Sequence, residues 1–144
     1  MRIPLGMEIW DNYVEFWTEG VSINMDEGTG VEITQEGTVA IVAFMSTSIS
    51  DVDKIAISSK QIKDFIDTNQ PPRLVFDFQG VKFFSSQVLG LLLEIRNKLQ
   101  TYNGEVVISA INPQLHRVFK ITNLDKVFRF FPDKESAVKT MNEA

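Results

Sequence analysis

The strongest constraint on the fold is a regular alternation of short apolar runs and amphipathic segments between residues 31 and 144. Apolar, β-branched runs predict strands, and apolar residues three or four positions apart predict helices. The predicted strands are 31–35, 38–44, 74–78, 105–111 and 127–131. Helices between and after them give the order ββαβαβαβα, which is typical of an α/β protein. We expect a mixed β-sheet, with an opening antiparallel hairpin and then parallel βαβ units, and about four helices.

Local signals indicate where the predicted helices begin and end. Pro71-Pro72 ends the first helix, because proline cannot continue one, and Asn123 can end the third in a left-handed turn. Pro113 fits the first position of that third helix. Candidate N-cap residues are Ser50 or Asp51, Ser85 or Ser86, Asn112, and Asp133. We expect the helices to favour one face of the sheet.

The first thirty residues differ in composition from the rest of the chain. They hold one cation, Arg2, and six acids, which account for the whole formal charge of −5. Residues 31–144 hold equal numbers of cations and anions. This shift and the Gly28-Thr29-Gly30 break predict an acidic aromatic N-terminal arm, residues 1–30, followed by one domain, residues 31–144.

The arm carries an aromatic stripe at helical spacing. Trp10, Tyr13, Val14 and Trp17 follow the i, i+3, i+4, i+7 pattern, which places them on one face of a helix. Two interpretations stay open. The stripe packs on its own domain, or it is a docking helix that joins two copies into a homodimer.

Several function classes are disfavoured. The chain has no cysteine and one histidine, His116, so we expect no metal site and no thiol chemistry. It has no glycine-rich phosphate loop and no recognisable catalytic set, so we expect no enzyme and no cofactor. The acidic balance argues against direct nucleic-acid binding. No apolar run could span a membrane and no signal segment is evident, which predicts a cytoplasmic protein.

A pair of serines lies between the 74–78 strand and the second helix, where Ser85 and Ser86 follow Phe83 and Phe84. The first turn of a helix presents unpaired N–H groups and the positive end of a dipole, and both favour an anion. A phosphoryl group on such a serine would therefore be accommodated. The competing interpretation is an unmodified N-cap serine.

The residues from Arg73 to about Phe130 resemble a STAS domain, the fold of bacterial anti-sigma factor antagonists. That family has a strand, an Asp-Ser-Ser/Thr-Gly-Leu-Gly loop that opens a helix, a glycine turn, another strand and a Ser-Pro helix start. The counterparts in this chain are Ser85-Ser86-Gln87-Val88-Leu89-Gly90, Asn103-Gly104 and Asn112-Pro113. With the opening hairpin, the resemblance covers nearly all of residues 31–144 and not the arm.

The resemblance implies a phosphorylation switch. In the family the first serine of the motif is phosphorylated by a serine kinase that is also the anti-sigma factor, and a phosphatase restores the free form. The matching residue is Ser86, with Ser85 as the alternative in the adjacent register. The chain departs from the motif at three positions: Ser85 replaces the Asp, Gln87 the second Ser/Thr, and Val88 the first Gly.

The partner surface that the resemblance implies combines the segment from Phe83 to Leu89 with the loop near Thr47 to Asp51. The candidate partner-binding residues are Thr47, Ser48, Ser50, Asp51, Phe83, Phe84, Ser85, Ser86, Gln87 and Leu89. Two other functions stay open. One is a constitutive STAS scaffold in a signalling or transport assembly, and the other is a small α/β enzyme or nucleotide binder of unrecognised type.

Overall fold

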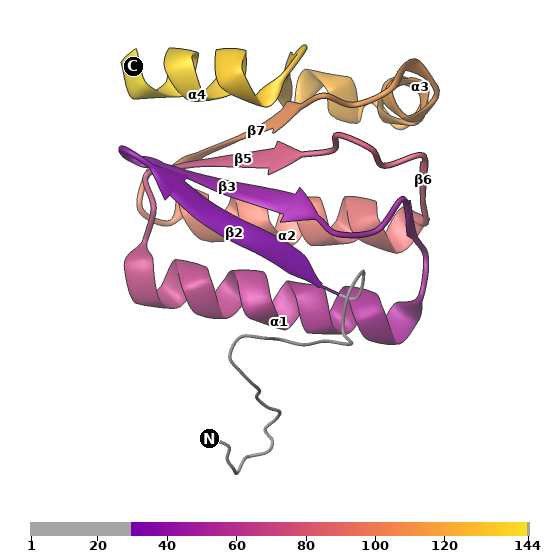
Figure 1. Ribbon diagram of the computed structural model, residues 1–144, viewed down its shortest axis with the longest axis horizontal. Coiled ribbons are helices and arrows are strands. Elements are labelled where there is room, and N and C mark those ends of the chain that lie inside the picture. Colours follow the sequence, from indigo (N-terminus) through magenta and orange to yellow (C-terminus); the bar gives the residue numbers. More distant parts are fainter. Residues whose placement is uncertain (1–29, 144) are drawn as a thin grey trace, which may run out of the picture.

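The predicted strands form one five-stranded sheet in a computed structural model of the chain, which describes residues 30–143. The strands are β2 (Val31–Glu36), β3 (Val39–Phe44), β5 (Arg73–Asp77), β7 (Glu105–Ser109) and β8 (Arg129–Phe131). They lie in the order β2-β3-β5-β7-β8. β2 and β3 pair antiparallel and every later pair is parallel, which confirms the mixed sheet (Figure 1).

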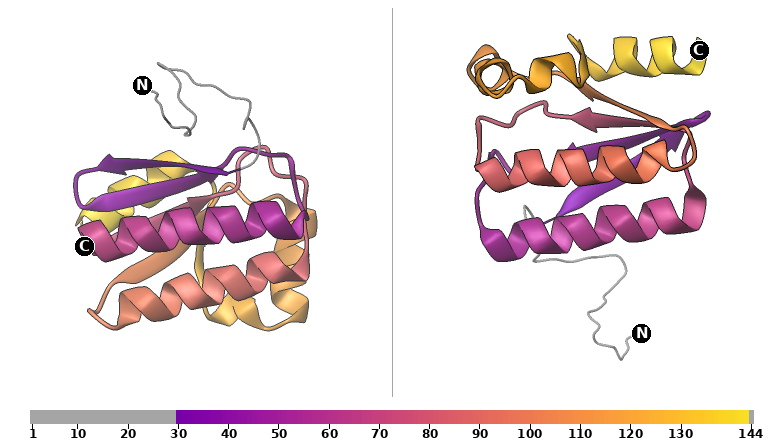
Figure 2. Two further views of the ribbon diagram at one scale, coloured as in Figure 1. Left: turned by 90° about the horizontal axis from the view of Figure 1, so that it is seen from below. Right: turned by 180° about the vertical axis from the view of Figure 1, so that it is seen from behind.

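Helices cover both faces of the sheet. α1 (Val52–Asn69) and α2 (Ser86–Gln100) lie side by side on one face, and α4 (Lys134–Glu143) lies on the other (Figures 1 and 2). α3 (Pro113–Ile121) adds Leu115 and Phe119 to the same hydrophobic cluster as α1 and α2. The strand order advances in one direction from β3 to β8, and right-handed crossovers of that kind place successive helices on one face.

The side chain of Asn142 in α4 fastens the hairpin turn. It accepts a hydrogen bond from the Thr38 amide at 3.2 Å and donates to the Glu36 carbonyl at 3.3 Å. Gly37 between them has φ +65°, and a Cβ there would lie 2.6 Å from Asn142 Oδ1. Glycine therefore suits this turn because of its backbone angle, and a larger residue would also displace the Asn142 side chain.

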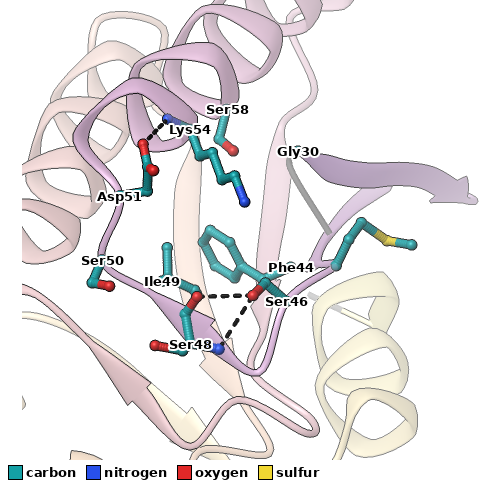
Figure 3. Close-up of a pocket in the computed structure, with 10 residues that line it drawn as sticks. Gly30, Phe44, Ser46, Ser48, Ile49, Ser50, Asp51, Lys54 and Ser58 are labelled. Atoms are coloured by element: carbon teal, nitrogen blue, oxygen red, sulfur yellow. Dashed lines mark hydrogen bonds between the residues drawn. The ribbon is translucent and has the colours of Figure 1, made fainter. Parts of the chain in front are cut away.

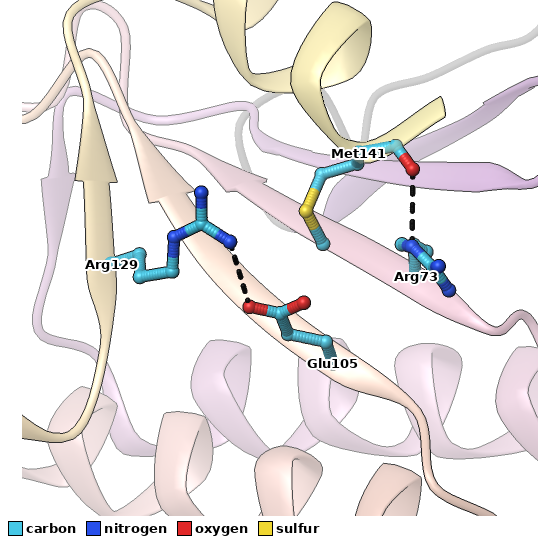
Figure 4. Close-up of polar contacts among 4 residues, drawn as sticks. All are labelled: Arg73, Glu105, Arg129 and Met141. Carbon is cyan, nitrogen blue, oxygen red and sulfur yellow. Dashed lines mark hydrogen bonds and ion pairs between the residues drawn. The ribbon is translucent and has the colours of Figure 1, made fainter. Parts of the chain in front are cut away.

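Polar side chains also tie neighbouring elements together near the amino ends of the parallel strands (Figure 4). Arg73 Nε on β5 donates to the Met141 carbonyl of α4 at 3.1 Å. Arg129 Nη1 on β8 lies 3.3 Å from Glu105 Oε2 on β7, and its guanidinium stacks over the Phe131 ring. Exposed ion pairs contribute less than about 1 kcal/mol each, so apolar burial remains the main source of stability.

The structure differs from the sequence prediction by two residues at one end of β7 and of β8, by single residues at the ends of β2, β3 and β5, and in one pair of short strands. β7 ends at Ser109 rather than residue 111, because Ala110 takes a left-handed φ of 58°. β8 begins at Arg129 rather than residue 127, because the short 3₁₀ helix η1 (Leu124–Lys126) precedes it and the Val127 amide closes that turn. The short strands β4 (Ser48–Ile49) and β6 (Phe83–Phe84) were not predicted. The predictions for the arm concern residues that lie outside the described range.

Candidate functional site

β4 and β6 bring together the two segments that the sequence analysis assigned to one surface. They pair as a parallel two-stranded ladder in which Ser48 faces Phe83 and Ile49 faces Phe84. The Thr47 carbonyl accepts hydrogen bonds from the amides of Lys82 at 2.7 Å and Phe83 at 3.2 Å. Residues separated by some 35 positions are thus fixed side by side at the carboxyl end of the main sheet.

The ladder is held to the domain by its inward-facing side chains. Ile49 and Phe84 are 8% and 6% exposed. The Phe84 ring makes edge-to-face contacts with Phe78 and Phe119, at centroid distances of 5.6 Å and 5.9 Å. Because side chains alternate along a strand, Phe83 points the other way and is 52% exposed. The ladder therefore presents one large apolar side chain to the outside on a rigid support.

Ser86 is the first residue of α2 and its side chain is exposed. The preceding residue, Ser85, is the N-cap and makes no side-chain cap hydrogen bond, and the first turn of α2 contains no acidic residue. Within residues 30–143, no hydrogen bond uses the amides of Ser86 or Gln87. Unpaired first-turn amides of this kind favour an anion placed beside them.

Ser85 has a different environment. Its backbone amide donates to the Ile49 carbonyl at 2.9 Å, so the residue is fixed against β4. Its Oγ is buried and has no hydrogen-bond partner among the described residues. A kinase could not reach this oxygen without local rearrangement of the helix start.

The predicted partner residues divide by exposure. Seven are exposed: Thr47, Ser48, Ser50, Asp51, Phe83, Ser86 and Gln87. Ser85 is half-buried. Phe84 and Leu89, at 6% and 8% exposure, belong to the hydrophobic core, contrary to the expectation that they face a partner. They support the exposed residues from beneath.

A small pocket lies behind the ladder, between the end of β3 and the first turns of α1 (Figure 3). Ser46 Oγ bridges the backbone of Ser48 at its rim, and the Asp51 carboxylate accepts hydrogen bonds from the amides of Asp53 and Lys54. Asp51 therefore acts as the N-cap of α1, as predicted. These bonds hold the loop that carries the exposed serines.

A buried polar pair stiffens the chain between β5 and β6. Asp77 is 9% exposed, and its Oδ1 accepts hydrogen bonds from Ser109 Oγ at 3.2 Å and from the Gln79 amide at 3.3 Å. The contribution of Ser109 was missed, because it depends on the register of β5 and β7.

The described residues offer little for metal or proton chemistry. No group of three or more His, Asp or Glu side chains between residues 30 and 143 is placed to hold a metal ion. His116 is half-buried against the Phe130 ring, with centroids 4.5 Å apart. In this same range, none of the helices combines the length and apolarity that a bilayer crossing requires.

The comparisons with known proteins agree with this architecture. The model of the STAS domain family matches residues 31–137, so the chain belongs to the STAS domain family. A STAS-domain containing protein of Pseudomonas aeruginosa is 25% identical over 59 residues. That match covers 41% of this chain and 58% of the relative, so the chain spans less than two thirds of the relative's length.

Several solved structures share the fold. An anti-sigma factor antagonist domain protein from Planctomyces limnophilus matches with a TM-score of 0.70 at 20% identity, over 78% of this chain and 97% of the other. An anti-sigma factor antagonist from Mycobacterium paratuberculosis matches with 0.66 at 25% identity, over 76% and 91%. The murine Slc26a9 anion transporter matches with 0.59 at 16% identity, over 77% of this chain but 19% of the transporter.

Proposed function

We propose that this chain is an anti-sigma factor antagonist-like binding module controlled by reversible phosphorylation of Ser86. Its partner is a serine kinase that also acts as an anti-sigma factor, and a phosphatase reverses the modification. In this proposal the unphosphorylated protein binds the kinase and the phosphorylated protein does not. The observation that carries the proposal is an exposed hydroxyl at the start of α2, beside an exposed apolar side chain on a hydrogen-bonded ladder.

The partner surface of this proposal consists of the exposed residues of the two segments. Phe83 is the apolar anchor, since buried aromatic side chains contribute most of the binding energy in protein interfaces. Exposed hydroxyls at Thr47, Ser48 and Ser50 supply adaptable polar contacts around it. Preformed backbone hydrogen bonds reduce the ordering cost of binding, because the ladder is already fixed in the free domain.

Electrostatics supports the switch. A phosphoryl group on Ser86 would add close to two negative charges at the first turn of α2, where the free amides can receive them. The fold would therefore tolerate the modification. A partner that covers Phe83 and Ser86 would instead have to desolvate the new charge, so its affinity would fall.

Val88, which replaces the first Gly of the family motif, is compatible with the helical backbone of α2. Val88 is fully buried in the core and its backbone is helical, so no glycine freedom is required at this position. Its amide donates to the Ser85 carbonyl at 3.0 Å, which closes the first turn of α2. The acceptor hydroxyl of Ser86 keeps its exposed position beside this turn.

The proposal is tested by partner binding. Binding of the cognate kinase is compared for the unmodified chain, Ser86→Glu and the control Gln35→Glu, which adds the same charge to exposed β2 far from the ladder. We expect Ser86→Glu to weaken binding at least about tenfold, roughly 1.4 kcal/mol, and Gln35→Glu to leave it unchanged. Equal binding by all three proteins would contradict the switch.

A second candidate function is a constitutive STAS scaffold in a signalling or transport assembly. The fold match to part of an anion transporter favours it, because it shows that a domain of this fold also occurs within a transport protein. In this case the same ladder surface would bind its partner irrespective of the charge at Ser86. The binding comparison above separates the two functions.

A further inference from the structure

The acidic arm is the largest feature of the chain that the proposed function does not use. It holds the entire net charge and both tryptophans of the protein. The point where it joins the domain is defined: the Gly30 carbonyl accepts a hydrogen bond from the Met45 amide at 3.3 Å. Gln61 on α1 fixes the next residue, because its side-chain amide bonds both the Val31 carbonyl, at 2.8 Å, and the Val31 amide, at 3.3 Å.

Three of the exposed apolar side chains of the domain lie in the ladder or close to it along the chain, and Met45 among them bonds to the junction. Five large hydrophobic residues are exposed within residues 30–143, and three of them lie in β6 or within three positions of β4. These are Met45, Val52 and Phe83, which are 49%, 60% and 52% exposed. We call these three residues, with Lys54 and Lys82, the ladder surface. Apolar side chains that gather at one place mark an interaction site more strongly than scattered ones.

Two lysines of the ladder surface are opposite in charge to the acids of the arm. Lys54 and Lys82 are exposed, and neither takes part in any of the four ion pairs of the described part of the chain. Asp51 and Asp53 are also exposed here; the Asp51 carboxylate is engaged by the first-turn amides of α1, and Asp53 lies between Val52 and Lys54 in the chain. The stripe formed by Trp10, Tyr13, Val14 and Trp17 is interspersed with Asp11 and Glu15. The two lysines could therefore pair with the acids of the arm, while the apolar side chains of the ladder surface meet the aromatic stripe.

We propose that residues 8–17 of the arm dock on the ladder surface of the same chain and so cover the surface that the partner would use. Residues 18–29 connect the two, and twelve residues with the dimensions of a random coil would have a root-mean-square span of about 20 Å. A linker of that length gives an effective concentration in the millimolar range, so weak contacts suffice. The docking competes with any partner of the ladder surface and does not depend on phosphorylation of Ser86.

The tryptophans provide the test, because Trp10 and Trp17 are the only ones in the chain. Emission and acrylamide quenching are measured on the full, unphosphorylated protein without a partner. The variants are Val52→Asp and Phe83→Asp, and Ile121→Asp is the control, since this 74% exposed residue lies at the distal end of α3. Val52→Asp keeps the test informative if Phe83→Asp misfolds, because an acid is favourable in the first turn of α1.

Docking predicts blue-shifted, protected tryptophans in the unmodified chain and in Ile121→Asp. Both ladder variants would shift the emission maximum and the quenching constant to the values of the urea-unfolded chain. Fully quenchable tryptophans in the unmodified chain would overturn the proposal, and so would protection that Val52→Asp leaves unchanged. Protection lost on dilution would also overturn it, because the arm would then dock on a second copy. None of these outcomes bears on the Ser86 switch, which is tested by partner binding.

Discussion

Ser85 and Ser86 are neighbours in the chain, yet their hydroxyl groups lie in opposite environments. The Ser86 side chain is exposed at the first position of α2. The Ser85 Oγ is buried and has no hydrogen-bond partner among residues 30–143. Accessibility therefore favours Ser86 over Ser85 as the modified residue in the proposed switch.

The unpartnered hydroxyl leads to a prediction about stability. Ser85→Ala should leave the free energy of unfolding unchanged or raise it slightly, because the substitution removes a buried polar group that makes no bond. Asp51→Ala should lower it by about 1 kcal/mol, since Asp51 is a hydrogen-bonded N-cap. Urea unfolding measures both. A loss for Ser85→Ala as large as that for Asp51→Ala would show that its hydroxyl is hydrogen-bonded.

The two phenylalanines of β6 should separate stability from binding. Phe84→Ala should cost about 3–5 kcal/mol, because the ring is buried between Phe78 and Phe119. Phe83→Ala should change stability by less than about 1 kcal/mol, since its ring is half exposed. Only Phe83→Ala should weaken partner binding in a protein that remains folded. Chemical denaturation and a binding titration on the same samples check both statements, and a large loss of stability for Phe83→Ala would contradict the assigned orientation of β6.

The N-cap of α4 gives a prediction about pH. Hydrogen bonds from the side chain and then the backbone amide of Ser136 lower the pKa of Asp133 below its ordinary value. A carboxyl whose folded pKa is lowered stabilises the fold above its unfolded pKa of about 3.9, and this contribution is lost as the pH falls through the folded value. Asp133→Ala should therefore lower the melting temperature at neutral pH, and the difference from the unmodified chain should disappear in acid.

The control for this prediction is Ser136→Ala, which removes the hydroxyl donor and should move the pKa of Asp133 back toward its ordinary value. Carbon NMR titration of the carboxyl group follows that pKa directly. A melting-temperature difference for Asp133→Ala that persists at low pH would mean that the residue stabilises α4 by some means other than its charge.

The sequence predicted most of the fold because long elements carry a periodic signal. Each α-helix and each main-sheet strand between residues 30 and 143 was predicted, and the N-caps Asp51 and Asn112 hold the predicted first-turn bonds. Left-handed Asn123, with φ 63°, ends α3 near its predicted position. The β4–β6 ladder was missed because strands of two residues contain no periodicity.

Less of the candidate site could be predicted. The sequence brought the Thr47–Asp51 and Phe83–Leu89 segments together only through a family resemblance, whereas their contact depends on backbone bonds to Thr47 and Ile49. The burial of Phe84 and Leu89 and the unpartnered Ser85 hydroxyl follow from packing in three dimensions. Residue type alone cannot distinguish adjacent serines, or adjacent phenylalanines, that point in opposite directions.

The central claim is that Ser86 is the phosphorylated residue, and phosphosite mapping tests it most directly. The full chain, Ser86→Ala and Ser85→Ala are each incubated with the cognate kinase and ATP, digested and analysed by mass spectrometry. The account predicts one phosphoryl group on Ser86 in the unmodified chain and in Ser85→Ala, and none in Ser86→Ala. Phosphate on Ser85 would contradict it. So would the absence of any phosphate on the chain after incubation with a kinase that phosphorylates its other substrates.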